Sequence, residues 1–201
     1  MTRTVLWEKQ GGIAVIRFAN PPINCVNALF LQDFDQVLDE IEKLEEIEVM
    51  VIASTNTKIF ATGRDERSQT ADTHIKQKLL KKIMERLANL PIPTICVITG
   101  TAIGAGLEIA LVCDLRIASE CSRFGFYSDI PPTEYGKKAL IDLAGPAKAK
   151  ELTWLGQLVG GREALGIGII NRLFPESHIT NEALEMAFSI IQYKQKIKSG
   201  K

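Results

Sequence analysis

Residues 99–118, TGTAIGAGLEIALVCDLRIA, combine residue types and a spacing that suit catalysis. Gly104, Ala105 and Gly106 form a run of small residues ahead of an apolar segment, and Glu108 follows two positions later. Small residues let a ligand approach the backbone closely, and the first N–H groups of a helix carry partial positive charge. Such a turn stabilises an oxygen that becomes negative during a reaction. The stretch therefore predicts an oxyanion-binding backbone with a carboxylate beside it.

A purely structural interpretation of the same stretch stays open. A glycine-rich turn ahead of an apolar helix also serves close packing, and a solvated first-turn glutamate such as Glu108 is stabilised by the helix dipole. The stretch lacks the GxGxxG fingerprint of dinucleotide-binding domains, and the chain has no GxxxxGK[ST] phosphate loop. Nucleotide binding of those two kinds is therefore not predicted.

The elements that position this stretch are predicted to alternate between strands and helices. Residues 95–99 are apolar and β-branched and predict a buried strand, whereas residues 107–112 predict a short buried helix. Residues 49–53, VMVIA, are typical of a strand buried on both faces of a parallel sheet. Apolar residues recur at helical spacing from about residue 27 to 44 and from 76 to 90. This alternation predicts an α/β domain with mainly parallel pairing and right-handed crossovers.

Shorter elements are predicted along the rest of the chain. Residues 4–7 and 13–18 flank a Gln-Gly-Gly turn and predict a β-hairpin. The polar residues 66–74 predict a loop, and residues 114–118 and 123–126 predict two strands. Further helices are predicted at three places: from about residue 137, over residues 147–155 and over about residues 181–198.

Composition excludes several classes of function. The chain has 201 residues, of which 46% are hydrophobic and 24% charged, and this suits one domain with or without an appendage. Its formal net charge is zero, so no broad basic surface for nucleic acid is predicted. No signal-peptide pattern and no apolar run long enough to span a bilayer is present, so no membrane partner is predicted.

The cysteines and histidines predict neither disulfides nor a metal site. The four cysteines have no CxxC spacing, and three lie in or near apolar segments, as small core residues do. His74 and His178 are far apart in polar surroundings, so no zinc site is predicted. These features favour a reducing, cytoplasmic compartment.

Four segments then carry a pattern in a fixed order along the chain. They are NPPINCVNAL from residue 20, IFATGRD from residue 59, TGTAIGAGLEIALVCDLRIA from residue 99 and WLGQLVGGREALGIGIINRLFP from residue 154. The last three are similar to F-[SA]-A-G-A-D, N-G-x-x-x-G-G-G-x-E-L-x-x-x-C-D-x-x-x-A and L-T-G-x-x-[IF]-x-A-x-E-A-x-x-x-G-L-[VI]-x-x-[VL]-x-P. Together they resemble the crotonase, or enoyl-CoA hydratase/isomerase, superfamily over roughly residues 1–177.

The resemblance implies a fold, a substrate and an assembly. It implies a crotonase-like spiral of ββα units with mainly parallel sheets over residues 1–177. Residues 178–201 would form a short C-terminal helix and tail in place of the several helices with which relatives continue. The implied substrate is an acyl-CoA thioester, with coenzyme A as part of the substrate and no separate cofactor. The implied assembly is a homotrimer or a dimer of trimers.

The resemblance also implies site residues. Two backbone N–H groups, those of Arg64 and Ala105, would hold the thioester oxygen and stabilise the enolate. Residues near them would line the CoA, mostly through the backbone: Thr62, Arg64, Asp65, Glu66, Gly104 and Ala105. Glu108 falls on the position of the first catalytic glutamate of the hydratases.

The second catalytic glutamate departs from the pattern. Its position holds Ser128, with Asp129 beside it, and serine cannot act as the second carboxylate. Some isomerases of the superfamily carry a base in the loop that opens the next helix, where Glu134 lies. Certain decarboxylases use a tyrosine in this loop, and Tyr135 falls near that place. Capping and packing roles for Glu134 and Tyr135 stay open.

Two functions from different classes therefore remain. The first is an acyl-CoA-processing enzyme of the hydratase/isomerase type, with Glu108 as acid/base and Asp129 or Glu134 as a second group. Decarboxylation on the same fold, with Tyr135, is a variant of it. The second is a CoA-ester-binding protein without catalytic activity, because Ser128 replaces a carboxylate.

Overall fold

Two β-sheets form the framework in the computed structural model, which describes residues 3–63, 70–127 and 131–200, excepting the side chains of 70–74. Within these residues the larger sheet has the strand order β1-β2-β3-β5-β7-β10 and the smaller sheet β4-β6-β8-β9. The larger sheet consists of β1 (Val5–Gln10), β2 (Ile13–Phe18), β3 (Val49–Ser54), β5 (Thr94–Ile98), β7 (Leu115–Ser119) and β10 (Arg172–Phe174). The smaller sheet consists of β4 (Ile59–Thr62), β6 (Thr101–Ile103), β8 (Arg123–Gly125) and β9 (Val159–Gly160).

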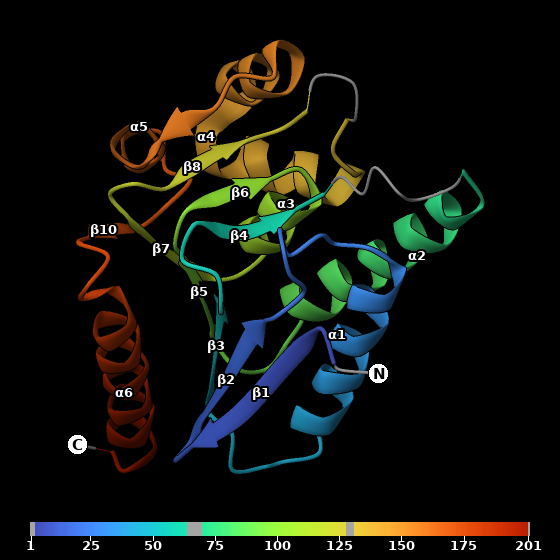
Figure 1. Ribbon diagram of the computed structural model, residues 1–201. Helices are drawn as coiled ribbons and strands as arrows, with labels where there is room; N and C mark the ends of the chain where they lie inside the picture. The colour runs from blue at the N-terminus through green and yellow to red at the C-terminus, as the bar shows by residue number, and fades with distance from the viewer. Residues whose placement is uncertain (1–2, 64–69, 128–130, 201) are drawn as a thin grey trace.

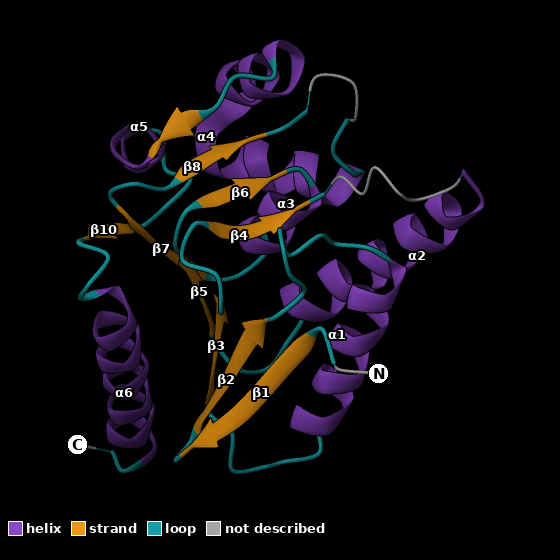
Figure 2. Ribbon diagram, viewed as in Figure 1, coloured by secondary structure: helices purple, strands orange, loops and turns teal. Residues whose placement is uncertain are grey.

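Helices, purple in Figure 2, alternate with the strands along the described part of the chain. They are α1 (Ala28–Ile41), α2 (Thr70–Ala88), α3 (Ala105–Leu111), α4 (Glu134–Leu155), α5 (Gly161–Gly166) and α6 (Ile179–Lys198). The sequence predicts the start of α1 well, because Asn27 is its N-cap and accepts a hydrogen bond from the N–H of Phe30 at 2.9 Å.

The chain repeats one unit three times. Each unit has a strand in the larger sheet, a strand in the smaller sheet and a helix, as in β3-β4-α2, β5-β6-α3 and β7-β8-α4 (Figure 1). The strands of successive units pair in parallel within each sheet, whereas the opening hairpin β1-β2 is antiparallel. The predicted α/β fold, with mainly parallel sheets and ββα units, is confirmed.

The two faces of the larger sheet are covered differently. Figure 1 shows α1 and α2 on one side of the sheet and α6 on the other. The buried face of α6 consists of Ile179, Ala183, Ala187 and Ile191, which join a cluster with Val15, Val51 and Val97 of the sheet. The boundary at residue 177 stays a prediction.

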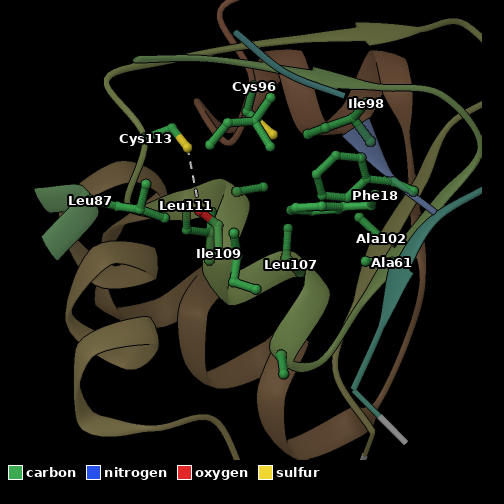
Figure 3. Close-up of a cluster of buried hydrophobic side chains, with 14 of the residues drawn as sticks. Phe18, Ala61, Leu87, Cys96, Ile98, Ala102, Leu107, Ile109, Leu111 and Cys113 are labelled. Atoms are coloured by element: carbon green, nitrogen blue, oxygen red, sulfur yellow. Dashed lines mark hydrogen bonds between the residues drawn. The ribbon is translucent and has the colours of Figure 1, made fainter. Parts of the chain in front are cut away.

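The main core lies between the sheets and α1 to α4. Figure 3 shows Leu107, Ile109 and Leu111 of α3 among side chains of the larger sheet, including Phe18 and Ile98. Three cysteines, Cys25, Cys96 and Cys113, are buried, and the Sγ of Cys113 donates to the carbonyl of Ile109. Their prediction as core residues is confirmed.

The structure departs from the sequence-based expectation at α2 and at β6. α2 begins at Thr70, so the predicted loop over residues 66–74 is wrong from that residue onward. β6 is a strand of its own in the smaller sheet, between the predicted strand over residues 95–99 and the predicted turn at Gly104, where the sequence predicts no element. The two helices predicted from residue 137 and over residues 147–155 are present as the two parts of α4, which are separated by the non-helical backbone of Gly145 (φ 79°) ahead of Pro146. Among the described residues, no helix is long and apolar enough to cross a bilayer.

Candidate active site

The ends of β4 and β6 bring two glycine-containing turns together. The strands pair in parallel with Thr62 opposite Ile103, so the turns that begin at Gly63 and Gly104 leave the same sheet edge side by side. A Cβ on Gly63 would lie 2.5 Å from the backbone nitrogen of Ala105. Only glycine therefore permits this close approach of the two backbones.

Ala105 presents its N–H at this edge. It is the first residue of α3, so no carbonyl of that helix accepts its N–H. The neighbouring N–H of Gly104 is engaged, because it donates to the carbonyl of Gly125 at 3.0 Å. The ring of Tyr127 packs over Gly104 and encloses the turn from the other side. Ala105 as a residue is 7% exposed, and its N–H is the donor that this turn offers.

The segment before α1 fixes the end of β4. The N–H of Thr62 donates to the carbonyl of Asn24 at 3.2 Å, and the carbonyl of Thr62 accepts from the N–H of Val26 at 2.8 Å. Asn24 is itself buried and donates through Nδ2 to the carbonyl of Phe60 at 3.0 Å. The hydroxyl of Thr62 is buried without a hydrogen-bond partner among the described residues. The end of β4, which leads into Gly63, is therefore fixed by the segment before α1 and by its pairing with β6.

Glu108 lies in the first turn of α3, as predicted, and only 3% of it is exposed. One carboxylate oxygen, Oε2, accepts from the N–H of Thr133 at 2.8 Å and also from the hydroxyl of Thr133. Gly136, in the first turn of α4, lies against the same oxygen, and a Cβ there would overlap the carboxylate. Packing between α3 and α4 therefore buries Glu108 and fixes its orientation.

Burial raises the pKa of Glu108 above its ordinary value, because the charged form loses hydration. The two hydrogen bonds from Thr133 and the positive charge of Lys76 act in the opposite direction and only partly compensate. A carboxyl group with a raised pKa exchanges protons more readily near neutral pH than an ordinary glutamate does. This property suits a general acid or base.

Lys76 is a site neighbour that sequence reasoning missed. Its Nζ donates to the carbonyl of Gly63, next to the N–H of Ala105. In the sequence Lys76 belongs to a lysine-rich helix face, which is most simply a solvated face. Thr133 was missed as well, because its contact with Glu108 spans 25 residues and depends on the length of the loop before α4.

The other predicted catalytic residues of α4 have different surroundings. Glu134 is exposed at the first position of the helix. The hydroxyl of Tyr135 donates to Oε1 of Glu85 on α2 at 2.8 Å, and this bond raises the pKa of Tyr135. Neither Glu134 nor Tyr135 is hydrogen-bonded to Glu108. The remaining predicted residues lie outside the described residues: Arg64, Asp65, Glu66, Ser128 and Asp129.

Among the described residues, the site contains the N–H of Ala105 as a backbone donor, the buried carboxyl group of Glu108 and the ammonium group of Lys76. In the part of the chain that the structure describes, no group of three or more His, Cys, Asp or Glu residues has the arrangement to hold a metal ion. A buried carboxyl group close to the first N–H of a helix is an arrangement that can transfer a proton beside a developing negative charge.

Comparison with known proteins gives consistent matches. The sequence profile described as enoyl-CoA hydratase/isomerase matches residues 8–199. A short-chain-enoyl-CoA hydratase of Clostridium acetobutylicum is 34% identical over 195 residues, which cover 93% of this chain and 75% of that protein. A putative enoyl-CoA hydratase/isomerase of Bacillus subtilis, YngF, is 32% identical and covers 90% of this chain and 73% of its own length.

Solved structures give the same result for the fold. DspI of Pseudomonas aeruginosa superposes with a TM-score of 0.89 at 26% identity and covers 95% of this chain and 81% of that one. An enoyl-CoA hydratase of Bacillus anthracis has a TM-score of 0.89 at 25% identity and covers 94% of this chain and 76% of that one. The matches extend across the candidate site and α6.

Proposed function

We propose, since the chain belongs to the enoyl-CoA hydratase/isomerase family, that it converts an acyl-CoA thioester through a thioester enolate. The N–H of Ala105, together with that of Arg64, stabilises the enolate oxygen. Glu108 moves the proton. Thr62, Asp65, Glu66 and Gly104 line the CoA through their backbones, and no cofactor besides the coenzyme A of the substrate takes part.

One observation carries this proposal: Glu108 is a buried carboxyl group with a raised pKa, three residues after the first N–H of α3. An enolate needs a donor at its oxygen and a base at its carbon, held at a fixed separation. The first turn of a helix keeps Ala105 and Glu108 at a constant spacing, which supports a shared role.

A single carboxyl group, Glu108, favours isomerisation of a double bond, because the same group can remove the proton and return it. Glu108 accepts a proton from the carbon next to the thioester, the C–H electron pair is shared with the thioester oxygen, and the proton returns to a more distant carbon. One carboxylate is enough for this cycle. Hydration of a 2-enoyl thioester instead needs a second group to activate water, for which Asp129 and Glu134 are the candidates.

The test is turnover of two simple thioesters in heavy water, followed by mass spectrometry. Wild-type protein is incubated with a short 2-enoyl-CoA and with the corresponding 3-enoyl-CoA. Conversion of the 3-enoyl to the 2-enoyl ester indicates isomerisation, whereas addition of a water molecule indicates hydration. We expect E108Q to lower the rate at least about 100-fold, since it removes the proton-transfer group.

Two further variants sharpen the result. E120Q makes the same change of charge at an exposed position and should keep the wild-type rate. E134Q tests the second carboxylate and should impair hydration more than isomerisation. Full activity of E108Q on a substrate that the wild-type protein converts would exclude the assigned role. Tight binding of acyl-CoA without conversion of either ester would favour the non-catalytic alternative, and loss of CO2 from a malonyl-type ester would favour decarboxylation.

A further inference from the structure

We propose that Thr133 is a positioning residue for Glu108: it holds Oε2 with two donors and leaves Oε1 to exchange the proton with the substrate. This inference rests on the proposed function, because it assigns a division of labour within the carboxylate that carries the reaction. It concerns a residue outside the four segments that define the resemblance.

The two donors converge on one oxygen. The N–H of Thr133 lies 2.8 Å from Oε2 of Glu108, and the hydroxyl of Thr133 donates to the same atom. An ionised carboxylate oxygen has two lone pairs, so these bonds occupy Oε2 fully. Gly136 packs against Oε2 and Cγ and prevents the carboxylate from rotating away. Proton exchange therefore falls to Oε1.

The direction of the hydroxyl proton follows from its neighbours. The N–H of Gly136 donates to Oγ1 of Thr133 at 3.1 Å, as expected for an N-cap residue, so that side of the oxygen is an acceptor. The single hydroxyl proton then has two candidate acceptors, the Sδ of Met84 at 3.7 Å and Oε2 of Glu108. A carboxylate is a much stronger acceptor than a thioether, so the proton goes to Glu108.

The same threonine thus opposes the effect of burial. Both of its bonds favour the ionised carboxylate, which is the form that accepts a proton. The partial positive charge at the start of α4 acts in the same sense. Without the hydroxyl, burial acts with less opposition and the carboxyl group holds its proton to higher pH.

Within residues 3–63, 70–127 and 131–200, few other charges face Glu108 from the elements packed around it. Lys76 on α2 favours the ionised form, whereas Glu85 on α2 is engaged by the hydroxyl of Tyr135. Glu134 on α4 is exposed. Asp129 lies outside the described residues. Any change in the titration of Glu108 on altering Thr133 therefore reports on the hydroxyl itself, provided that Lys76 is unchanged.

The experiment is a titration of Glu108 by 13C NMR of its carboxyl carbon in the full chain, with the resonance assigned by its loss in E108Q. T133V replaces the hydroxyl by a methyl group and keeps the shape of the side chain, whereas T133S keeps the hydroxyl. We expect T133V to raise the pKa of Glu108 by about one unit or more, the size expected for one hydrogen bond to a charged group. T133S should titrate as the wild type does.

A purely structural capping role predicts a different outcome. Loss of the cap would lower the melting temperature of T133V and leave the pKa of Glu108 where it was, and that result would overturn the inference. T133A repeats the measurement if T133V does not fold, because it removes the hydroxyl without adding a methyl group near Met84.

The catalytic readout separates this inference from the proposed function. With an enoyl-CoA substrate, T133V should shift the pH dependence of kcat upward by the same amount as the titration and lower kcat about tenfold at neutral pH, with KM little changed. An unchanged pH dependence contradicts the inference. A wild-type protein that converts no enoyl-CoA contradicts the proposed function, while the NMR titration still decides how Thr133 acts on Glu108.

Discussion

Burial of Glu108 makes the stability of the protein depend on pH. Because its pKa is raised in the folded protein, the folded state binds this proton more tightly than the unfolded state does. Stability from this group is therefore fully present below the ordinary pKa of 4.5 and is lost as the pH rises through the raised value.

E108Q should remove this dependence. Glutamine keeps an oxygen that accepts the two bonds from Thr133 and carries no charge to bury. We expect the variant to gain about 1 kcal/mol in the free energy of unfolding near neutral pH, and to show no gain in acid. Urea unfolding followed by circular dichroism at several pH values measures both. A loss of stability at neutral pH would mean that Thr133 and Lys76 outweigh the cost of burial.

The sequence predicts part of this site and cannot predict the rest. The small residues before Glu108 indicate both the N–H of Ala105 and a first-turn carboxylate, because these features are local. The partner of Glu108 is Thr133, whose approach depends on how α4 packs against α3. Tyr135 illustrates the same limit, because its hydroxyl reaches Glu85 on α2, a residue 50 positions away.

At the level of elements, Arg116 joins the end of α3 to the segment before β10. It is 2% exposed, its Nε donates to the carbonyl of Ile169 at 2.8 Å, and its Nη1 donates to the carbonyl of Cys113. Burial lowers the pKa of Arg116, and the neighbouring Cys113, Cys96 and Asp114 oppose that effect only in part. Backbone carbonyls are its hydrogen-bond acceptors along most of the guanidinium.

R116M should therefore be strongly destabilising. Methionine fills much of the volume and leaves several buried carbonyls without donors, so we expect a loss of about 3 kcal/mol in the free energy of unfolding. R172M makes the same change at an exposed position of β10 and should cost less than about 0.5 kcal/mol. Urea unfolding of the two variants in parallel tests the difference, and equal stabilities would contradict the role given to Arg116.

Elements with a clear local signal were the predictable ones. The opening hairpin, the buried strand β3 and the start of α1 at Asn27 each follow from turn residues, apolar runs or a cap. β6 has no clear signal, because three residues directly after Gly100 are too short a run to show strand periodicity. The break between the two helices of α4 is predictable, since Gly145 and Pro146 interrupt the helical pattern and Gly145 has non-helical backbone angles.

On the scale of the whole molecule, the end of α4 carries an apolar surface. Trp154 is 72% exposed, Leu155 60% and Leu158 49%. Single chains seldom leave neighbouring large apolar side chains in water without a partner. This surface fits the expectation from the superfamily resemblance that the chain assembles with copies of itself, as a trimer or a dimer of trimers.

Analytical ultracentrifugation tests this assembly. We expect the wild-type protein to sediment as a trimer or larger, and W154D combined with L155D to shift it toward the single chain by placing two charges in the contact. L6D, on the edge strand β1, adds a charge at another exposed leucine and should leave the assembly intact. A wild-type protein that sediments as a single chain would contradict this expectation.

The backbone at the ends of β4 and β6, which consists of Gly63, Gly104 and Ala105 and is called the cradle below, has a consequence for how this protein can evolve. Its geometry depends on the register of two parallel strands and on Gly63, and much less on the side chain that carries the N–H. Ala105 stands where the superfamily pattern has glycine, and it is the first residue of α3. β4 already has an irregularity between Ile59 and Ala61, but one residue gained or lost beyond it, in either strand, would move a strand end by about 3.3 Å and reverse its faces. Lineages can therefore vary substrate and reaction by point substitution around the cradle, whereas insertions and deletions are confined to the loops beyond it.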